Sequence, residues 1–107
     1  MNLSVQNMPP LEWTTPIQLM EETKVVNQTG HQLDLTVAIY SIDGTQIENA
    51  HFLPSEEGHF IIPKPPYHTP ERVQVSLFCY QRDDSTSPTY ERHISFLDLF
   101  RNEDYRL

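Results

Sequence analysis

Few residues of this chain have the types and spacing that chemistry at a protein site requires. Cys79 is its single cysteine, and a thiol becomes a nucleophile only when a neighbouring base or cation lowers its pKa. It follows Val73, Val75 and Leu77 at every second position, which predicts that it points into the core of a strand-built fold. The sequence therefore favours a buried, reduced thiol over a catalytic one.

The other polar residues match no metal or phosphate signature. The histidines are His31, His51, His59, His68 and His93, and their spacings fit no zinc motif. The carboxylate pairs Glu56-Glu57 and Asp83-Asp84 lack the flanking ligands and the glycine of a calcium loop. With 3 glycines in all, the chain has no phosphate-binding loop. We expect no catalytic residue, no metal, no cofactor and no enzymatic activity.

Length and charge limit the possible partners. The 107 residues fit one domain, residues 1–107, because half of such a chain could not bury a stable core. The net charge of -8 opposes direct binding to nucleic acid. There is no apolar run near the roughly 18 residues of a membrane span, and Met1-Asn2-Leu3-Ser4 does not open a secretory leader. We therefore expect an intracellular protein that binds neither membrane nor, by itself, DNA.

Alternating apolar and polar residues predict the central strands. The clearest strand has Leu33, Leu35, Val37 and Ile39 on one face. Asp43-Gly44 then predicts a tight hairpin turn, after which residues 46–50 return antiparallel.

Further strands are predicted before and after this hairpin. They cover residues 3–8, 17–20, 60–62, 73–80 and 90–96. No convincing helix is found, and only residues 48–51 and 98–104 could hold a single helical turn. Pro65-Pro66-Tyr67 forms a rigid corner between two of the strands. These features predict an all-β, immunoglobulin-like sandwich of about seven strands.

Several of these segments occur in the order found in one known family. They are Ile17-Gln18-Leu19-Met20, Lys24-Val25, the hairpin, Phe60-Ile61-Ile62 before the Pro65-Pro66-Tyr67 corner, and Val73-Gln74-Val75-Ser76-Leu77. Over residues 3–100 the chain resembles the dimerisation domain of Rel/NF-kappaB transcription factors, an immunoglobulin-like domain of the IPT type. The resemblance implies a protein of cytoplasm and nucleus that pairs with itself or a related subunit. DNA would be bound by a separate domain.

The resemblance also implies which residues meet across the dimer. By position, Gln18, Met20, His59 and Ile61 correspond to dimer-face residues. Met20 and Ile61 would supply apolar area, and Gln18 and His59 would form hydrogen bonds at the rim. The alternative is that Met20 and Ile61 are ordinary core residues.

A second candidate interaction face is formed by Phe78 and Tyr80, which alternate with the core positions of their strand. Alternatively, the polar loop or the stretch Phe100-Arg101-Asn102 covers both rings. Exposed rings would suit an immunoglobulin-like adaptor that binds an unrelated protein. An extracellular adhesion domain is a third possibility, and it would require glycans on Asn2 and Asn27 and pairing of Cys79 between chains.

Overall fold

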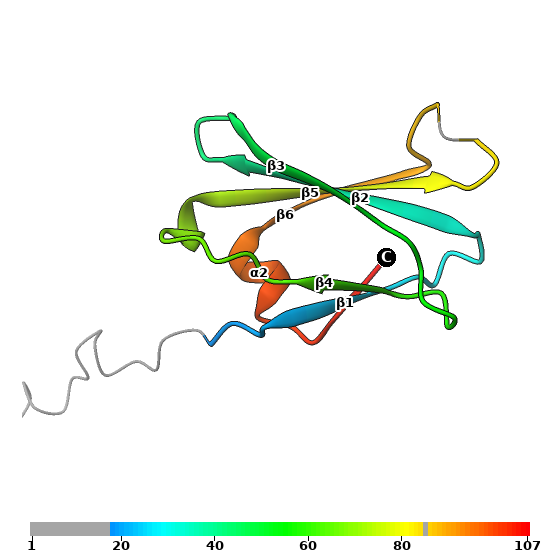
Figure 1. The fold of residues 1–107 in the computed structure, drawn as a ribbon, viewed down its shortest axis with the longest axis horizontal. Helices are drawn as coiled ribbons and strands as arrows, with labels where there is room; N and C mark the ends of the chain where they lie inside the picture. The colour runs from blue at the N-terminus through cyan, green and yellow to red at the C-terminus, as the bar shows by residue number, and fades with distance from the viewer. Residues whose placement is uncertain (1–17, 85) are drawn as a thin grey trace, which may run out of the picture.

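The structure is a computed structural model that describes residues 18–84 and 86–107. The described chain is mostly β-structure and forms one three-stranded and one four-stranded sheet (Figure 1). The strands are β1 (Glu22–Val26), β2 (Leu33–Ser41), β3 (Gln46–Phe52), β4 (Phe60–Pro63), β5 (Val73–Gln81), β6 (Tyr90–Ser95) and β7 (Asp104–Arg106). Two short helices are η2, a 3₁₀ helix over Pro70–Arg72, and α2, over Phe96–Phe100. The prediction of an all-β fold with two sheets is confirmed.

The four-stranded sheet has the order β3-β2-β5-β6 and is antiparallel throughout. The predicted alternation in β2 and β5 is confirmed by the register, which pairs Leu35 with Cys79 and Val37 with Leu77. All four of these side chains are buried. Directly opposed residues lie on the same face of an antiparallel sheet, so the apolar faces of both strands point to one side.

The hairpin between β2 and β3 forms as predicted. Gly44 has a φ of +92°, a conformation that residues with a Cβ rarely adopt. The turn is closed by hydrogen bonds in which the backbone N–H of Ser41 donates to Thr45 O (2.8 Å) and that of Gly44 donates to Ser41 O (2.9 Å). Asp43 accepts a hydrogen bond from the Ser41 hydroxyl and another from the Thr45 backbone N–H.

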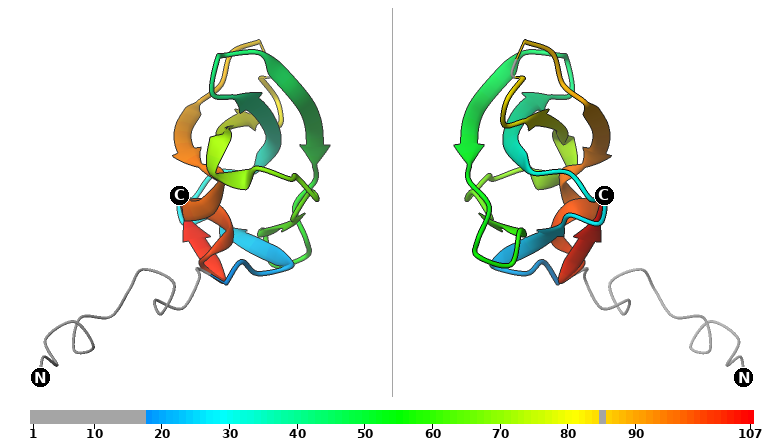
Figure 2. Two further views of the ribbon diagram at one scale, coloured as in Figure 1. Left: turned by 90° about the vertical axis from the view of Figure 1, so that its left-hand side faces the viewer. Right: turned by 90° about the vertical axis from the view of Figure 1, so that its right-hand side faces the viewer.

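The three-stranded sheet has the order β4-β1-β7. β1 is antiparallel to β4 and parallel to β7, so the C-terminal strand lies beside the first described strand (Figure 2). The hydroxyl of Thr23, which is buried, donates to Asn102 O at 2.9 Å and helps hold the approach to β7. β7 was not predicted, because three residues of mixed polarity carry no alternation that a sequence could reveal.

The core lies between the two sheets. Its side chains are Val25, Phe60 and Ile62 of the three-stranded sheet, the apolar faces of β2 and β5, and Phe96, Leu99 and Phe100 of α2. Figure 1 shows α2 between the sheets at one end of the molecule. Tyr67 of the proline corner packs edge-on against Phe96, with ring centroids 5.5 Å apart. The corner therefore closes this end of the core.

The last predicted strand is partly wrong. Strand β6 ends at Ser95, and Phe96 begins α2 where the sequence suggested continued alternation. Ser95 caps this helix, because its hydroxyl accepts a hydrogen bond from the Asp98 backbone N–H at 3.1 Å. In a helical turn Phe96, Leu99 and Phe100 all reach the core, whereas a strand would direct alternate residues outward.

The two earliest predicted strands have different outcomes. The one at residues 3–8 lies outside the described residues, as does Ile17. The one at residues 17–20 is wrong, because Gln18, Leu19 and Met20 belong to no strand and β1 begins at Glu22. The backbone N–H of Met20 donates instead to Phe100 O at 2.7 Å. The β-branched residues that suit a sheet come later, in Glu22–Val26.

Candidate functional site

The outer face of the three-stranded sheet combines one apolar side chain with charges of both signs. Ile61 of β4 is directly opposite Lys24 of β1, and Lys24 is paired on its other side with Asp104 of β7. Because Val25, Phe60 and Ile62 are buried in the core, the intervening residues point outward. Ile61 is 43% exposed, so it is not the core residue that the alternative required.

Glu22 and Arg106 extend this outer face along the strands. Glu22 is paired with Pro63, and Arg106 is paired with Val26. Together with Lys24 and Asp104 they give two positive and two negative side chains around Ile61. We call Glu22, Lys24, Ile61, Asp104 and Arg106 the outer patch. Its formal charge is zero, although the whole chain carries -8.

The structure brings only part of the predicted dimer face to this sheet. Ile61 lies on β4, and His59 immediately precedes that strand. His59 is half-buried, and its Nδ1 atom is buried without a hydrogen-bond partner among the described residues. Gln18 is exposed and Met20 half-buried, but both precede β1, and the Met20 backbone is bonded to the end of α2. Strand β4 therefore forms where it was predicted, whereas Gln18 and Met20 lie outside any strand, and the dimer face itself stays a prediction.

Phe78 and Tyr80 lie on the outer face of the four-stranded sheet, as predicted. Both are half-buried. The stretch Phe100-Arg101-Asn102 does not cover them, because Phe100 lies in the core on the other side of the sheet. Phe78 instead contacts His93 of β6 edge-on, with ring centroids 6.3 Å apart. The two rings therefore lie half-buried on the outer surface of the sheet.

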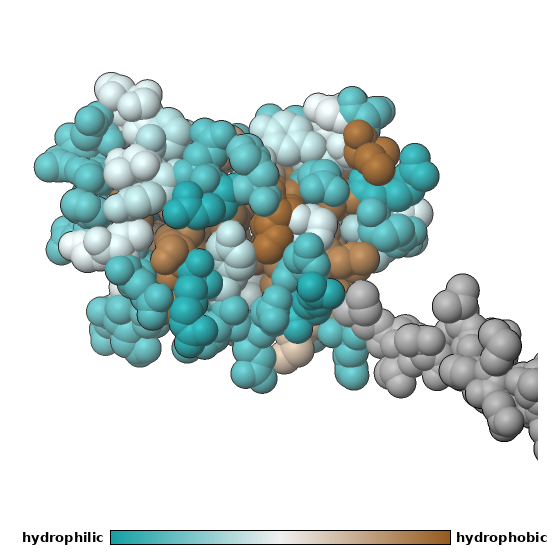
Figure 3. All heavy atoms as spheres, turned by 180° about the vertical axis from the view of Figure 1, so that it is seen from behind, coloured by the Kyte–Doolittle hydropathy of each residue, from teal (hydrophilic) through white to brown (hydrophobic). Residues whose placement is uncertain are grey.

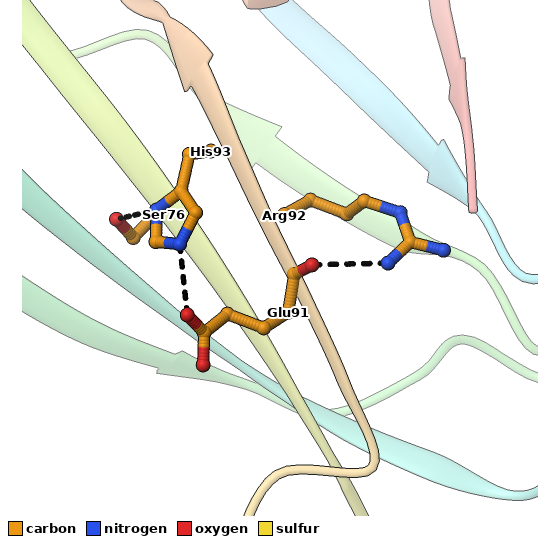
Figure 4. Close-up of polar contacts among 4 residues, drawn as sticks. All are labelled: Ser76, Glu91, Arg92 and His93. Atoms are coloured by element: carbon orange, nitrogen blue, oxygen red, sulfur yellow. Dashed lines mark hydrogen bonds and ion pairs between the residues drawn. The ribbon is translucent and has the colours of Figure 1, made fainter.

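A hydrogen-bonded group of polar residues lies beside Phe78. The Oγ atom of Ser76 is 2.8 Å from His93 Nδ1, and His93 Nε2 is 2.8 Å from Glu91 Oε2 (Figure 4). Figure 4 shows these three side chains on one side of β6 and Arg92 on the other. This group could not be predicted from the sequence, because Ser76 and His93 are 17 residues apart and only the β5–β6 register makes them neighbours.

The chemistry of this group is limited by its position. A serine, a histidine and a carboxylate in a row are the side chains of a hydrolase triad. Ser76, however, is 6% exposed and lies in β5, whose backbone is paired with β2 and with β6. The backbone N–H groups of β5 are thus engaged in the sheet. An oxyanion hole needs N–H donors that are not already hydrogen-bonded. The arrangement fits a hydrogen bond that orders the sheet surface better than it fits acyl transfer.

Cys79 is fully buried in the core, as predicted. Burial raises the pKa of its thiol from 9.0 to about 11, against a smaller opposite effect of Arg92. A thiol with a raised pKa holds its proton at neutral pH and is a poor nucleophile. Within residues 18–84 and 86–107, no three histidine, cysteine, aspartate or glutamate side chains converge to hold a metal ion.

The surface carries separate apolar patches and no continuous apolar area on the face that Figure 3 shows, where hydrophilic residues surround each patch. The exposed large apolar residues of the described chain are Ile42, Ile47, Leu53 and Ile61. Ile61 is the one that belongs to the three-stranded sheet. No helix of the described part is both long enough and apolar enough to cross a membrane.

Comparisons with models of known protein families, with curated protein sequences and with solved structures found nothing that matches this chain.

Proposed function

We propose that this chain is an immunoglobulin-like dimerisation domain, with the role that the dimerisation domain has in Rel-like transcription factors. It would hold two subunits together so that a separate domain can bind DNA. The outer patch is the observation that carries the proposal. An exposed isoleucine surrounded by balanced charges can meet a copy of itself without the repulsion expected between two acidic chains.

The strand order supports the immunoglobulin-like type. Such sandwiches place strands C′, C, F and G in one sheet and pair strands B and E in the other. The order β3-β2-β5-β6 and the antiparallel pair of β1 with β4 correspond to these sheets. β7 lies next to β1, at the place that strand A usually takes. The strand order thus matches that of an immunoglobulin-like sandwich except at the edge of the smaller sheet, where β7 takes the place of strand A.

Sedimentation equilibrium of the purified chain over a wide concentration range tests the proposal. We expect a reversible dimer whose mass depends on concentration. A monomer at every concentration would contradict self-association. Mixing with a candidate related subunit would then test for heterotypic pairing.

An adaptor domain is the second candidate function, and one observation favours it. A hollow of about 510 Å³ lies over β2 and β3 and is lined by Thr36, His51, Leu53 and Tyr80, among others. Leu53 at this hollow is 78% exposed. An unrelated protein could place an apolar side chain there. A strictly monomeric chain whose binding to a partner depends on Leu53 or Tyr80 would favour this function.

A further inference from the structure

The two sheets part along the side where β3 and β4 form their edges, and a groove of about 290 Å³ opens there. Val37 and Ile39 line it from the four-stranded sheet and Ile62 from the other. These three side chains belong to the buried core, so the groove reaches core residues from outside. Phe52 and Phe100 add aromatic surface. A concave, mainly apolar site of this kind suits one or two apolar side chains.

The described chain begins directly beside this groove. The backbone N–H of Lys64, which lines the groove, donates to Glu21 O at 2.9 Å. The backbone N–H of Met20 donates to the carbonyl of Phe100, another lining residue. Residues 1–17 are therefore tethered within a few residues of the groove. An extended chain spans about 3.3–3.6 Å per residue, so a short return brings this segment into it.

The composition of that segment fits the groove. Residues 8–13 read Met-Pro-Pro-Leu-Glu-Trp and include the only tryptophan of the chain. Adjacent prolines stiffen a chain in an extended form, which lowers the entropy lost when it binds to an aromatic-lined groove. The segment has one charge, Glu12. Two charged residues line the groove, Lys64 and Glu48, and Lys64 forms no ion pair with any of the described residues.

We propose that the groove between β3 and β4 binds the chain's own segment Met8–Trp13, with the Trp13 indole against Phe52 and Ile62 and with Glu12 facing Lys64. A tethered segment binds at a high effective concentration, so weak contacts suffice. The proposal is independent of dimerisation, because the outer patch lies on the opposite face of the three-stranded sheet from the core that the groove reaches.

Fluorescence of the full chain tests this directly, because Trp13 is its only tryptophan. We expect Trp13 emission at shorter wavelength than that of N-acetyltryptophanamide, with weaker quenching by acrylamide. Ala50→Arg would put a long charged side chain into the groove, and we expect emission and quenching to become those of the free compound. Asn49→Arg is the matched control, because Asn49 is the neighbouring residue on the opposite face of β3 and should leave both unchanged.

Two results would overturn the proposal. One is a wild-type Trp13 that is quenched as strongly as N-acetyltryptophanamide. The other is protection of Trp13 that survives Ala50→Arg in a protein whose circular dichroism shows it folded. A third outcome is that Trp13 is protected from acrylamide only at concentrations where the chain is a dimer, and loses this protection on dilution to the monomer. The segment would then bind a second copy of the chain, which also contradicts docking within one chain.

A second measurement does not depend on the folding of the Ala50 variant. Nuclear Overhauser contacts between the Trp13 ring protons and the methyl groups of Ile62 and Val37 should be present in the wild-type chain at concentrations where it is monomeric. Their absence in an otherwise assigned spectrum would exclude the proposed position.

Discussion

Ile61 of β4 lies directly opposite Lys24 of β1 in the antiparallel pair, so the exposed isoleucine of the three-stranded sheet is bordered by an ammonium group. Lys24 in turn has Asp104 as its neighbour on β7. Two copies of this arrangement can bury the apolar side chains and pair opposite charges around them. This relationship is the physical basis of the proposed dimer.

Truncation of Ile61 should weaken self-association. We expect Ile61→Ala to raise the dimer dissociation constant by about tenfold or more, since the loss of about 1.4 kcal/mol is a factor of ten. Phe78→Ala, on the other sheet, should change it little. Sedimentation equilibrium measures both, with circular dichroism as a check on folding. Equal effects of the two variants would contradict the assignment of the interface to the three-stranded sheet.

Stability should fall at alkaline pH because of Cys79. The pKa of its thiol is raised from 9.0 to about 11 in the folded protein, so the folded state keeps the proton after the unfolded chain has lost it. The free energy of unfolding is therefore unaffected by this group well below pH 9.0 and decreases as pH rises from there toward about 11.

Urea unfolding at pH values on either side of 9.0 measures this effect of Cys79. In Cys79→Ala the alkaline decrease should be shallower than in the wild type, with a remaining slope from groups such as Tyr67, whose pKa is raised by burial. An identical pH dependence of the two proteins would show that the thiol is not the titrating group.

The β2–β3 hairpin should be sensitive to substitution of Gly44. A Cβ at this residue meets no other atom, but a φ of +92° is strained for a residue with a side chain. We expect Gly44→Ala to lower the free energy of unfolding by about 1 kcal/mol. Gly44→Asn is the comparison, because asparagine tolerates positive φ better and should cost less. Equal costs in chemical denaturation would point to a cause other than backbone strain.

Ser76 should not react as a hydrolase nucleophile. It is hydrogen-bonded to His93, yet it is buried in a strand whose backbone is paired on both sides. We expect no covalent adduct with a fluorophosphonate probe by intact mass spectrometry, under conditions that fully label a serine hydrolase. An adduct on Ser76 that is lost in His93→Ala would contradict this and would indicate acyl-transfer chemistry.

Much of the larger sheet could be predicted because its signals are local. Strand β2 alternates from Leu33 to Ile39, and its turn carries the Asp-Gly pair that a tight hairpin needs. The residues before β1 were predicted less well, since the Met20 backbone bonds to Phe100, a distant residue. Strand β7 is an edge strand that pairs with β1, a partner at the other end of the described chain. Elements that depend on distant partners leave no periodic pattern in the chain.

The all-β class, the buried Cys79 and the outward Phe78 could be predicted from the chain alone, because a strand places alternate side chains on opposite faces whatever it packs against. The packing of the two sheets, by contrast, directed Ile61 outward, and strand pairing set which outward residues are neighbours. Register placed Lys24 between Ile61 and Asp104 and His93 between Ser76 and Glu91. Such neighbours depend on hydrogen bonding between separate strands, which the order of residues along one strand does not specify.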